Sequence, residues 1–392
     1  MSVISLWQHL LLFTVFKLGN AFVPISDHIE PFSFQGRSYG LQFNIKTDLR
    51  SPNARKSHLK QSVGTVDASG IEKESISIES YQHKDWKCTY LYKPPSPGYE
   101  SSPPLLLIHP VGIGISSWFW RRFMEEYQED GPAMYAIDLI GCGLEHGADK
   151  WDPNEKGLFF PLSWAEGCET LIQSVILPRF YDAKKSGGIM TNISGLFQGS
   201  TKTNNNPEGC IVVAQGGIAP VGLLLASRNP TAVNKLILSS PPIWNDIVLP
   251  VPQNELERNY NFLRSPLFGP IAFGILESRK AVQFFSDLFL FETPCDDEWL
   301  DCVAEGALKE ARAPVEAFNA GLCMHRSLEE EATGLVQPTL VVSGESDKRA
   351  TDRNGYGTEM RECGLEMVKT CNVIPWENPE GLKKVIHIFF ER

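Results

Sequence analysis

Short apolar segments alternate with stretches of helical spacing along most of the chain, starting near residue 76. Residues 75–82 and 87–93 alternate apolar and polar side chains with a period of two, which is typical of half-buried strands. Residues 103–112 form an apolar run interrupted by a His-Pro pair, which suits a central parallel strand buried on both faces. Similar runs recur at 132–143, 211–217, 235–242 and 338–347. Strands that alternate with helices in this way predict an α/β fold with a doubly wound, mostly parallel sheet.

Two segments interrupt the alternation of strands and helices. Residues 184–209 are rich in Gly, Ser, Thr and Asn, a composition that predicts a mobile surface loop. Residues 243–337 lie between two predicted strands, and their aromatic, helix-like sequence is too long for a simple connection. We therefore expect a helical cap at 243–337 over the carboxyl edge of the sheet. It is inserted between a first core part at 76–242 and a second at 338–392.

The N-terminal region has the order of a targeting sequence. Residues 1–21 contain an apolar run too short for a membrane span and end in small residues, Gly19 and Ala21, at the positions of a cleavage site. Phe22 follows directly, and this order resembles the bipartite plastid presequence of algae with secondary plastids. The resemblance implies a signal peptide at 1–21 and a transit-peptide-like leader at 22–65, with no stable membrane span in the mature chain. An ordinary secretory signal is the alternative.

Charge and cysteine content narrow the range of partners and cofactors. The formal net charge is −11 and no basic stripe is visible, which argues against a nucleic-acid partner because phosphate binding needs clustered Lys and Arg. The nine cysteines form no C-x-x-C pair and no close His/Cys cluster, so we expect no metal and no cofactor. Most of these thiols are expected to be buried and reduced. A protein partner is compatible with all of these features.

Several motifs within residues 103–392 stand in the order that α/β-hydrolases show. Residues 109–112 resemble the oxyanion loop after the third strand, and residues 138–143 resemble the D-x-x-G-x-G turn after the fourth. Residues 344–347 resemble the turn that carries the catalytic acid. The sequence is therefore similar to the α/β-hydrolase superfamily, and its overall texture is similar to a branch found in cyanobacteria and plastids.

The resemblance implies a catalytic triad from which two of the three side chains are missing. In active members a serine attacks the acyl carbon, a histidine takes its proton, and an acid orients the histidine. Here the nucleophile position is Gly216. The histidine position, counted back from the final E-x-P-E element, is Asn372, whose amide cannot take a proton at neutral pH. Asp347 occupies the acid position; the alternative is that it only caps its own turn.

The oxyanion hole of this superfamily consists of backbone amides, so it does not depend on the missing side chains. The resemblance assigns its donors to the N–H groups of Val111 and Gly217. A displaced active site is the alternative to a lost one. Its candidates are Cys142, the thiol nearest the predicted cleft, and His146, which follows the same turn. The sequence identifies no base beside Cys142.

Aromatic residues are frequent in the predicted cap, which indicates a large apolar pocket unless they only fasten the cap to the sheet. We therefore expect a plastid protein of the α/β-hydrolase fold without serine-hydrolase chemistry. It binds an apolar small molecule, such as a lipid, isoprenoid or pigment derivative, or acts as a scaffold. One alternative is a lyase, hydratase or isomerase that uses the oxyanion hole and Asp347. Another is a hydrolase with a displaced nucleophile.

The leader makes a direct prediction about localisation. A fusion of residues 1–65 to a fluorescent protein, expressed in an alga with a secondary plastid, should enter that plastid, because Ala21 and Phe22 resemble its presequence cleavage site. Phe22→Ala should hold the fusion in an earlier compartment, which fluorescence microscopy would show. Secretion of the unchanged fusion would contradict the plastid assignment.

Overall fold

The described part of the chain is built around one eight-stranded sheet. The computed structural model describes residues 76–127, 130–191 and 209–391, so the predicted leader segments within 1–65 lie outside the described residues. The strands are β1 (Ser77–His83), β2 (Trp86–Lys93), β3 (Leu105–Ile108), β4 (Met134–Ile137), β5 (Cys210–Gln215), β6 (Val233–Ser239), β7 (Thr339–Gly344) and β8 (Cys363–Val368). Their order is β1-β2-β4-β3-β5-β6-β7-β8, and the pairs β1–β2 and β2–β4 are antiparallel while the others are parallel. The predicted doubly wound, mostly parallel α/β sheet is confirmed.

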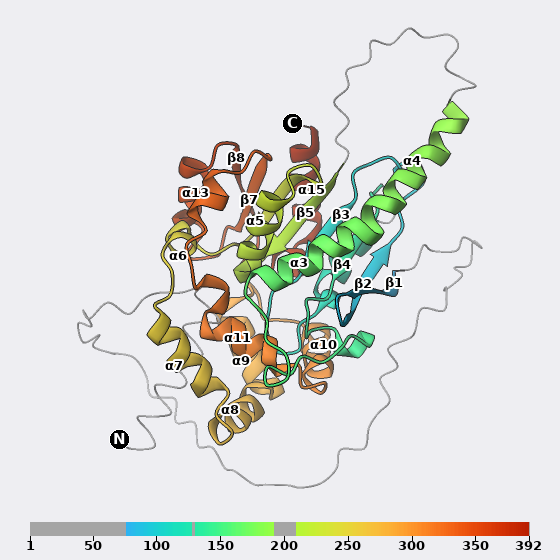
Figure 1. The fold of residues 1–392 in the computed structure, drawn as a ribbon. Helices are drawn as coiled ribbons and strands as arrows, with labels where there is room; N and C mark the ends of the chain where they lie inside the picture. The colour runs from blue at the N-terminus through green and yellow to red at the C-terminus, as the bar shows by residue number, and fades with distance from the viewer. Residues whose placement is uncertain (1–75, 128–129, 192–208, 392) are drawn as a thin grey trace. The chain divides into compact units, whose positions relative to one another are not determined.

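Each face of the sheet carries its own hydrophobic cluster. Successive residues of β3, such as Leu105 and Leu106, belong to different clusters, as the two-residue period of a strand demands. One face is covered by α3 (Leu162–Leu171) and α5 (Ala219–Arg228), and the other by α15 (Pro379–Glu391), as Figure 1 shows. The short helix α2 (Arg121–Glu125) packs in the same cluster as α15. The continuous apolar runs of the central strands follow from this coverage of both faces.

The helical segment after α3 is longer than the sequence predicted. A π-helical turn at Ile172–Ile176 joins α3 to α4 (Leu177–Thr191), which projects past the edge of the sheet in Figure 1. Residues 184–191 therefore belong to a helix and not to the predicted loop. A nucleated helix extends through weak helix formers at low cost, which explains the difference. The rest of that predicted loop, residues 192–208, lies outside the described residues.

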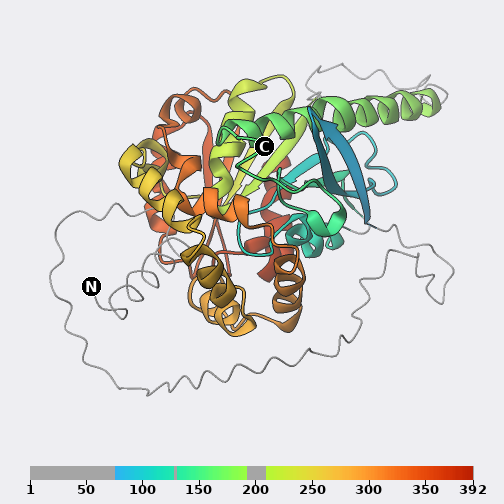
Figure 2. The ribbon, with the colours of Figure 1, turned by 60° about the horizontal axis from the view of Figure 1, so that its bottom comes forward.

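A helical insertion separates β6 from β7, as predicted. Figures 1 and 2 show its helices α7 to α11 gathered at one end of the sheet. The helices of the insertion are α6 (Trp244–Val248), α7 (Gln253–Leu263), α8 (Phe268–Leu276), α9 (Arg279–Phe289), α10 (Asp297–Ala307), α11 (Arg312–Ala320) and α12 (Glu329–Thr333). We call this insertion the cap.

The loop after β3 packs against α10 of the cap through backbone atoms. A Cβ atom on Gly306 would lie 2.2 Å from the carbonyl oxygen of Gly114, and one on Gly114 would lie 2.1 Å from that of Val303. Gly114 also has a φ of 66°, in the left-handed region that favours glycine. Because both positions are glycine, the backbone of the loop that carries Val111 can pack directly against α10 of the cap.

Three further observations concern membranes, cysteines and metals. In the described ranges, no helix combines the length and the apolar character needed to cross a bilayer. All nine cysteines are described and are free thiols, most of them buried. Within those same parts of the chain, no group of three or more His, Cys, Asp or Glu side chains could hold a metal ion.

Candidate functional site

The turn between β5 and α5 holds Gly216, the predicted nucleophile position, in a left-handed backbone conformation. The strand ends at Gln215 in an extended conformation, and Gly216 follows with a φ of 66° before the helix begins. A Cβ atom at Gly216 would have one near neighbour, the Cβ of Pro110 at 3.8 Å, which is ordinary van der Waals contact. The left-handed backbone therefore favours glycine at this position, whereas the available space would admit a side chain.

A cavity of about 160 Å³ lies at this turn. The loops after β3, β5, β6 and β7 form its floor, because parallel strands deliver their carboxyl ends to the same edge of the sheet. Five residues that the sequence placed at the site line this cavity: Val111, Gly216, Gly217, Asp347 and Asn372. The structure thus brings together positions that are as far as 261 residues apart in the chain, the separation of Val111 and Asn372.

The carboxylate at the acid position is bound to an arginine. Asp347 Oδ2 lies 2.7 Å from a guanidinium nitrogen of Arg353, which is only 4% exposed, and accepts a weak hydrogen bond from Asn372 Nδ2 at 3.4 Å. Asp347 Oδ1 accepts from the backbone N–H of Arg349 at 3.0 Å. The carboxylate therefore caps its own turn and, at the same time, neutralises a buried cation.

Asn372 connects three parts of the site. Its backbone N–H donates to the carbonyl of Leu290 at the end of α9 (2.9 Å), and its carbonyl accepts from Nε2 of Gln215 (2.8 Å). Its side chain reaches Asp347. The residue at the predicted histidine position thus joins the cap, the end of β5 and the turn that holds Asp347. Its side-chain amide cannot accept a proton at neutral pH.

A second ion pair joins the cap to the acid turn. Arg349, which lines the cavity, lies 3.1 Å from Oδ2 of Asp246 in α6. Burial raises the pKa of the Asp246 carboxyl to about 7, although the Arg349 charge opposes this shift. Asp246 itself does not line the cavity, but its partner Arg349 does.

The wall that faces the sheet's edge is apolar and comes from the cap. Its apolar residues are Leu276, Val282, Phe285, Phe289, Leu290, Trp299, Val303 and Phe318, and its one hydroxyl among the described residues, that of Ser286, accepts from Nε1 of Trp299 at 3.0 Å. Phe318 lies directly on the turn after β5, since a Cβ atom on Gly217 would approach its ring to 2.3 Å. Other aromatic residues of the cap do not line the cavity; Phe291, for example, packs against Trp299 with ring centroids 5.1 Å apart.

The two predicted oxyanion donors follow neighbouring strands of the sheet and both line the cavity. Val111 follows β3, and Gly217 lies in the 3-10 turn Gly216–Ile218 that leads into α5. Amides in the first turn of a helix have no intrahelical acceptor. The role of both groups as oxyanion donors stays a prediction.

Solved structures with a similar fold include enzymes of three different activities. A serine hydrolase involved in carbazole degradation has a TM-score of 0.56 at 15% identity, with 81% of this chain and 99% of that chain covered. An epoxide hydrolase has a TM-score of 0.53 at 17% identity, with 81% and 99% covered. A loop variant of a haloalkane dehalogenase from Bradyrhizobium elkanii has a TM-score of 0.51 at 16% identity, with 80% and 96% covered. The chain has the α/β-hydrolase fold.

The comparisons define the fold of the chain and not its reaction. No protein-family model matches this sequence, and the curated proteins include none with a similar sequence. The α/β-hydrolase fold carries different chemistries in the three structures above, so the reaction must be argued from the site itself.

The first displaced candidate, Cys142, lies outside the cavity. It is buried in the turn after β4, and burial raises the pKa of its thiol well above the usual range. A thiol becomes a good nucleophile when its pKa is lowered, so this environment acts in the opposite direction.

The second displaced candidate, His146, belongs to a buried Ser-His-Asp cluster outside the cavity. Its Nδ1 lies 2.9 Å from Oδ2 of Asp138 and 3.4 Å from the hydroxyl of Ser117. The residue types match a hydrolase triad, but both partners meet the same ring nitrogen. A relay in an α/β-hydrolase needs the acid on one nitrogen and the serine on the other. Ser117 is also fully buried, so the cluster lacks both the geometry of such a relay and an exposed hydroxyl.

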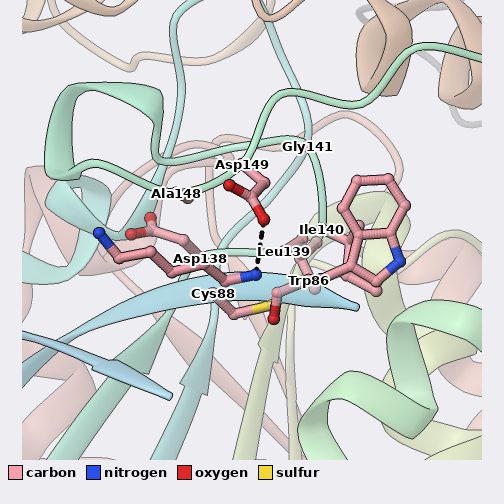
Figure 3. Close-up of a pocket in the computed structure, with 9 residues that line it drawn as sticks. Trp86, Cys88, Asp138, Leu139, Ile140, Gly141, Ala148 and Asp149 are labelled. Carbon is pink, nitrogen blue, oxygen red and sulfur yellow. Dashed lines mark hydrogen bonds between the residues drawn. The ribbon is translucent and has the colours of Figure 1, made fainter. Parts of the chain in front are cut away.

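The turn after β4 also borders a second pocket, shown in Figure 3. Asp138 and Gly141 contribute to its lining, and the backbone N–H of Lys87 donates to Asp149 across 2.8 Å beside them. The pocket has no room for a water molecule. It offers no second site for a ligand near Cys142 or His146.

Several residues of the site carry no signal in the sequence. Gln215 and Ser240 line the cavity at the ends of β5 and β6, and Arg349 and Arg353 follow the acid position. The polar position before the turn glycine could have drawn attention to Gln215. The two arginines could not have been found, because their contacts depend on how the acid turn folds back on the sheet.

The His146–Asp138 pair predicts a pH-dependent stability. Burial would lower the pKa of His146, but the Asp138 carboxylate outweighs it and the pKa is raised. A raised folded-state pKa stabilises the fold fully below the unfolded value of about 6.5, and this contribution is lost as the pH rises through the folded value. His146→Gln should therefore lower the free energy of unfolding by about 3 kcal/mol near pH 6, and by clearly less near pH 9.

Denaturant unfolding of both proteins at the two pH values measures this difference. His325→Gln is the matched control, because the His325 side chain is exposed and its Nδ1 lies within hydrogen-bonding distance only of a backbone carbonyl. It should leave the free energy of unfolding nearly unchanged. An equal loss for His146→Gln at both pH values would show that the charge on His146 does not contribute.

Proposed function

We propose that this protein binds an apolar small molecule and has no serine-hydrolase activity. The observation that carries the proposal is the composition of the cavity. Its predicted nucleophile position is Gly216 and its predicted histidine position is Asn372, so neither position carries a hydroxyl or a general base. Its cap wall is apolar, with Phe285, Phe289 and Phe318 among the lining side chains.

The ligand that best fits such a cavity is a lipid, an isoprenoid or a pigment derivative. A scaffold function, in which the fold serves a protein partner, is compatible with the same loss of chemistry. The leader supports a place in the plastid of an alga with a secondary plastid, and the fusion of residues 1–65 described above tests that place. The haloalkane dehalogenase and the epoxide hydrolase with the same fold act on organic substrates, and this supports a cavity for organic molecules in the present chain.

A second candidate function is an enzyme that needs no nucleophile, namely a lyase, hydratase or isomerase. One observation favours it: Arg349 lines the cavity and is paired with Asp246, a carboxyl whose pKa is raised to about 7 by burial. Such a carboxyl could transfer a proton at neutral pH. Turnover of a natural ligand that Asp246→Asn abolishes would decide in favour of this candidate.

Saturable binding of a hydrophobic dye tests the proposed site. The neutral dye N-phenylnaphthylamine should bind the full chain, and Val282→Trp should weaken binding by about tenfold, because the larger side chain occupies part of the cavity. Leu308→Trp is the matched control, since Leu308 is on the cap but is 82% exposed and does not line the cavity. Equal fluorescence titrations for both variants would place the dye elsewhere and would remove the support for the proposed site.

Introducing serine at position 216 and histidine at position 372 tests the expected lack of serine-hydrolase activity. The unchanged protein and Gly216→Ser should neither hydrolyse p-nitrophenyl esters above background nor react with fluorophosphonate probes, because a serine without a base is a poor nucleophile. Gly216→Ser with Asn372→His should gain weak, probe-sensitive esterase activity, since Asn372 already reaches Asp347. The gain should be far from additive.

Competition from Arg353 for the Asp347 carboxylate should keep this gained activity small. The left-handed backbone at position 216 should also cost the serine variants about 1–2 kcal/mol of stability. Turnover by the unchanged protein that Cys142→Ala or His146→Ala abolishes would instead show an active, displaced site.

A further inference from the structure

The side-chain amide of Gln215 is fixed in one orientation. Gln215 is 1% exposed, lines the cavity, and donates from Nε2 to the carbonyl oxygen of Asn372 at 2.8 Å. The flipped amide would place two oxygens against each other, so the hydrogen bond assigns Oε1 to the opposite side. This Oε1 atom is buried and accepts no hydrogen bond from any described residue. A buried oxygen of this kind requires a donor, and none of the described residues supplies one there.

Ser240 carries a second buried polar atom without a partner. It follows β6, lines the cavity, is 2% exposed, and its hydroxyl has no hydrogen-bond partner among the described residues. Its φ of 45° lies in the left-handed region, which is costly for a serine. A hydrogen bond from its N–H to the carbonyl of Val342, at 2.8 Å, holds this conformation.

The two unpartnered groups are neighbours across the sheet. Gln215 is paired with Ser239 in the parallel register of β5 and β6, so Ser240 comes one residue beyond that pair at the same edge. Buried polar groups without partners destabilise a protein, and both of these line one cavity whose opposite wall is apolar. A ligand with one small polar end would satisfy both at once.

We infer that the cavity takes an apolar alcohol, whose terminal hydroxyl donates to Oε1 of Gln215 and accepts from the hydroxyl of Ser240. This inference rests on the proposed function and names the chemical class of its ligand. A carboxylate has no proton to donate and would face the Gln215 oxygen, whereas a hydrocarbon or an ether leaves that oxygen unpaired. An ammonium group would meet Arg349 and Arg353 in the same cavity. A hydroxyl group is the smallest uncharged end group that both donates and accepts, so it meets these requirements.

Two isomers of the same formula test the requirement for a donor. Decanol and nonyl methyl ether differ in whether the oxygen carries a hydrogen, and decanoate adds a negative charge. Their dissociation constants for the full chain are measured by displacement of N-phenylnaphthylamine. Decanol should bind about tenfold more tightly than the ether and than decanoate, the ratio that one ordinary hydrogen bond provides. The ether is the more apolar isomer, so hydrophobicity alone predicts the reverse order.

Variants at Gln215 and Ser240 test whether these two residues cause the preference for decanol over the ether. Gln215→Met keeps the length of the side chain and removes the acceptor, and it should abolish the preference for decanol over the ether. Ser240→Gly removes the hydroxyl while it relieves the left-handed backbone, so it should fold and reduce the preference severalfold. Ser239→Ala is the control, because the Ser239 hydroxyl also has no partner among the described residues but does not line the cavity. It should keep the preference.

The outcomes separate this inference from the function on which it rests. Equal binding of decanol and the ether to the unchanged protein, or a preference that Gln215→Met and Ser240→Gly both retain, overturns the alcohol site and leaves the apolar site standing. If the dye binds nowhere in the cavity and none of the three compounds is bound, the proposed function is overturned together with the inference.

Discussion

The parallel arrangement of the central strands is the constraint on which this site depends. Because their carboxyl ends meet at one edge, the loops after β3, β5, β6 and β7 lie within reach of one another whatever side chains they carry. The cap closes over that edge and is held there by the backbone contact between Gly114 and Gly306. The cavity is therefore a product of the topology, and its chemistry is set by a few residues at strand ends.

Asp347, at the predicted acid position, shows how the fold accommodates a buried carboxylate at a strand end. In an active triad the imidazole partners the acid, and an isolated buried carboxylate is costly. In this chain Arg353 takes that place at 2.7 Å from Asp347, and Asn372 adds a weak bond. The charge of the Asp347 carboxylate is therefore compensated without a histidine. Its contacts with Arg353 and Asn372 hold the carboxylate in its turn.

The sequence predicted the parts of this structure that depend on local pattern. Continuous apolar runs indicated strands buried on both faces. Motif spacing selected Asp347 and Asn372, whose side chains lie 3.4 Å apart in the structure. The pairing of Asp347 with Arg353 could not be predicted, because nothing in the sequence shows which way an arginine six residues later will turn. The extension of α4 to Thr191 was missed for a different reason, since helix propagation overrides residue preference.

The neighbouring strands β5 and β6 are each followed by a residue with a left-handed backbone conformation, but the residue types differ. At the end of β5 the left-handed position is Gly216, with a φ of 66°, where glycine costs little. At the end of β6 the left-handed position is Ser240, with a φ of 45°, although glycine would be less costly there too. Ser240 gains nothing from its hydroxyl within the described structure, because that group has no partner. A serine in a strained backbone conformation, whose hydroxyl has no partner among the described residues and which lines the same cavity as Gln215, is the feature on which the inferred alcohol site rests.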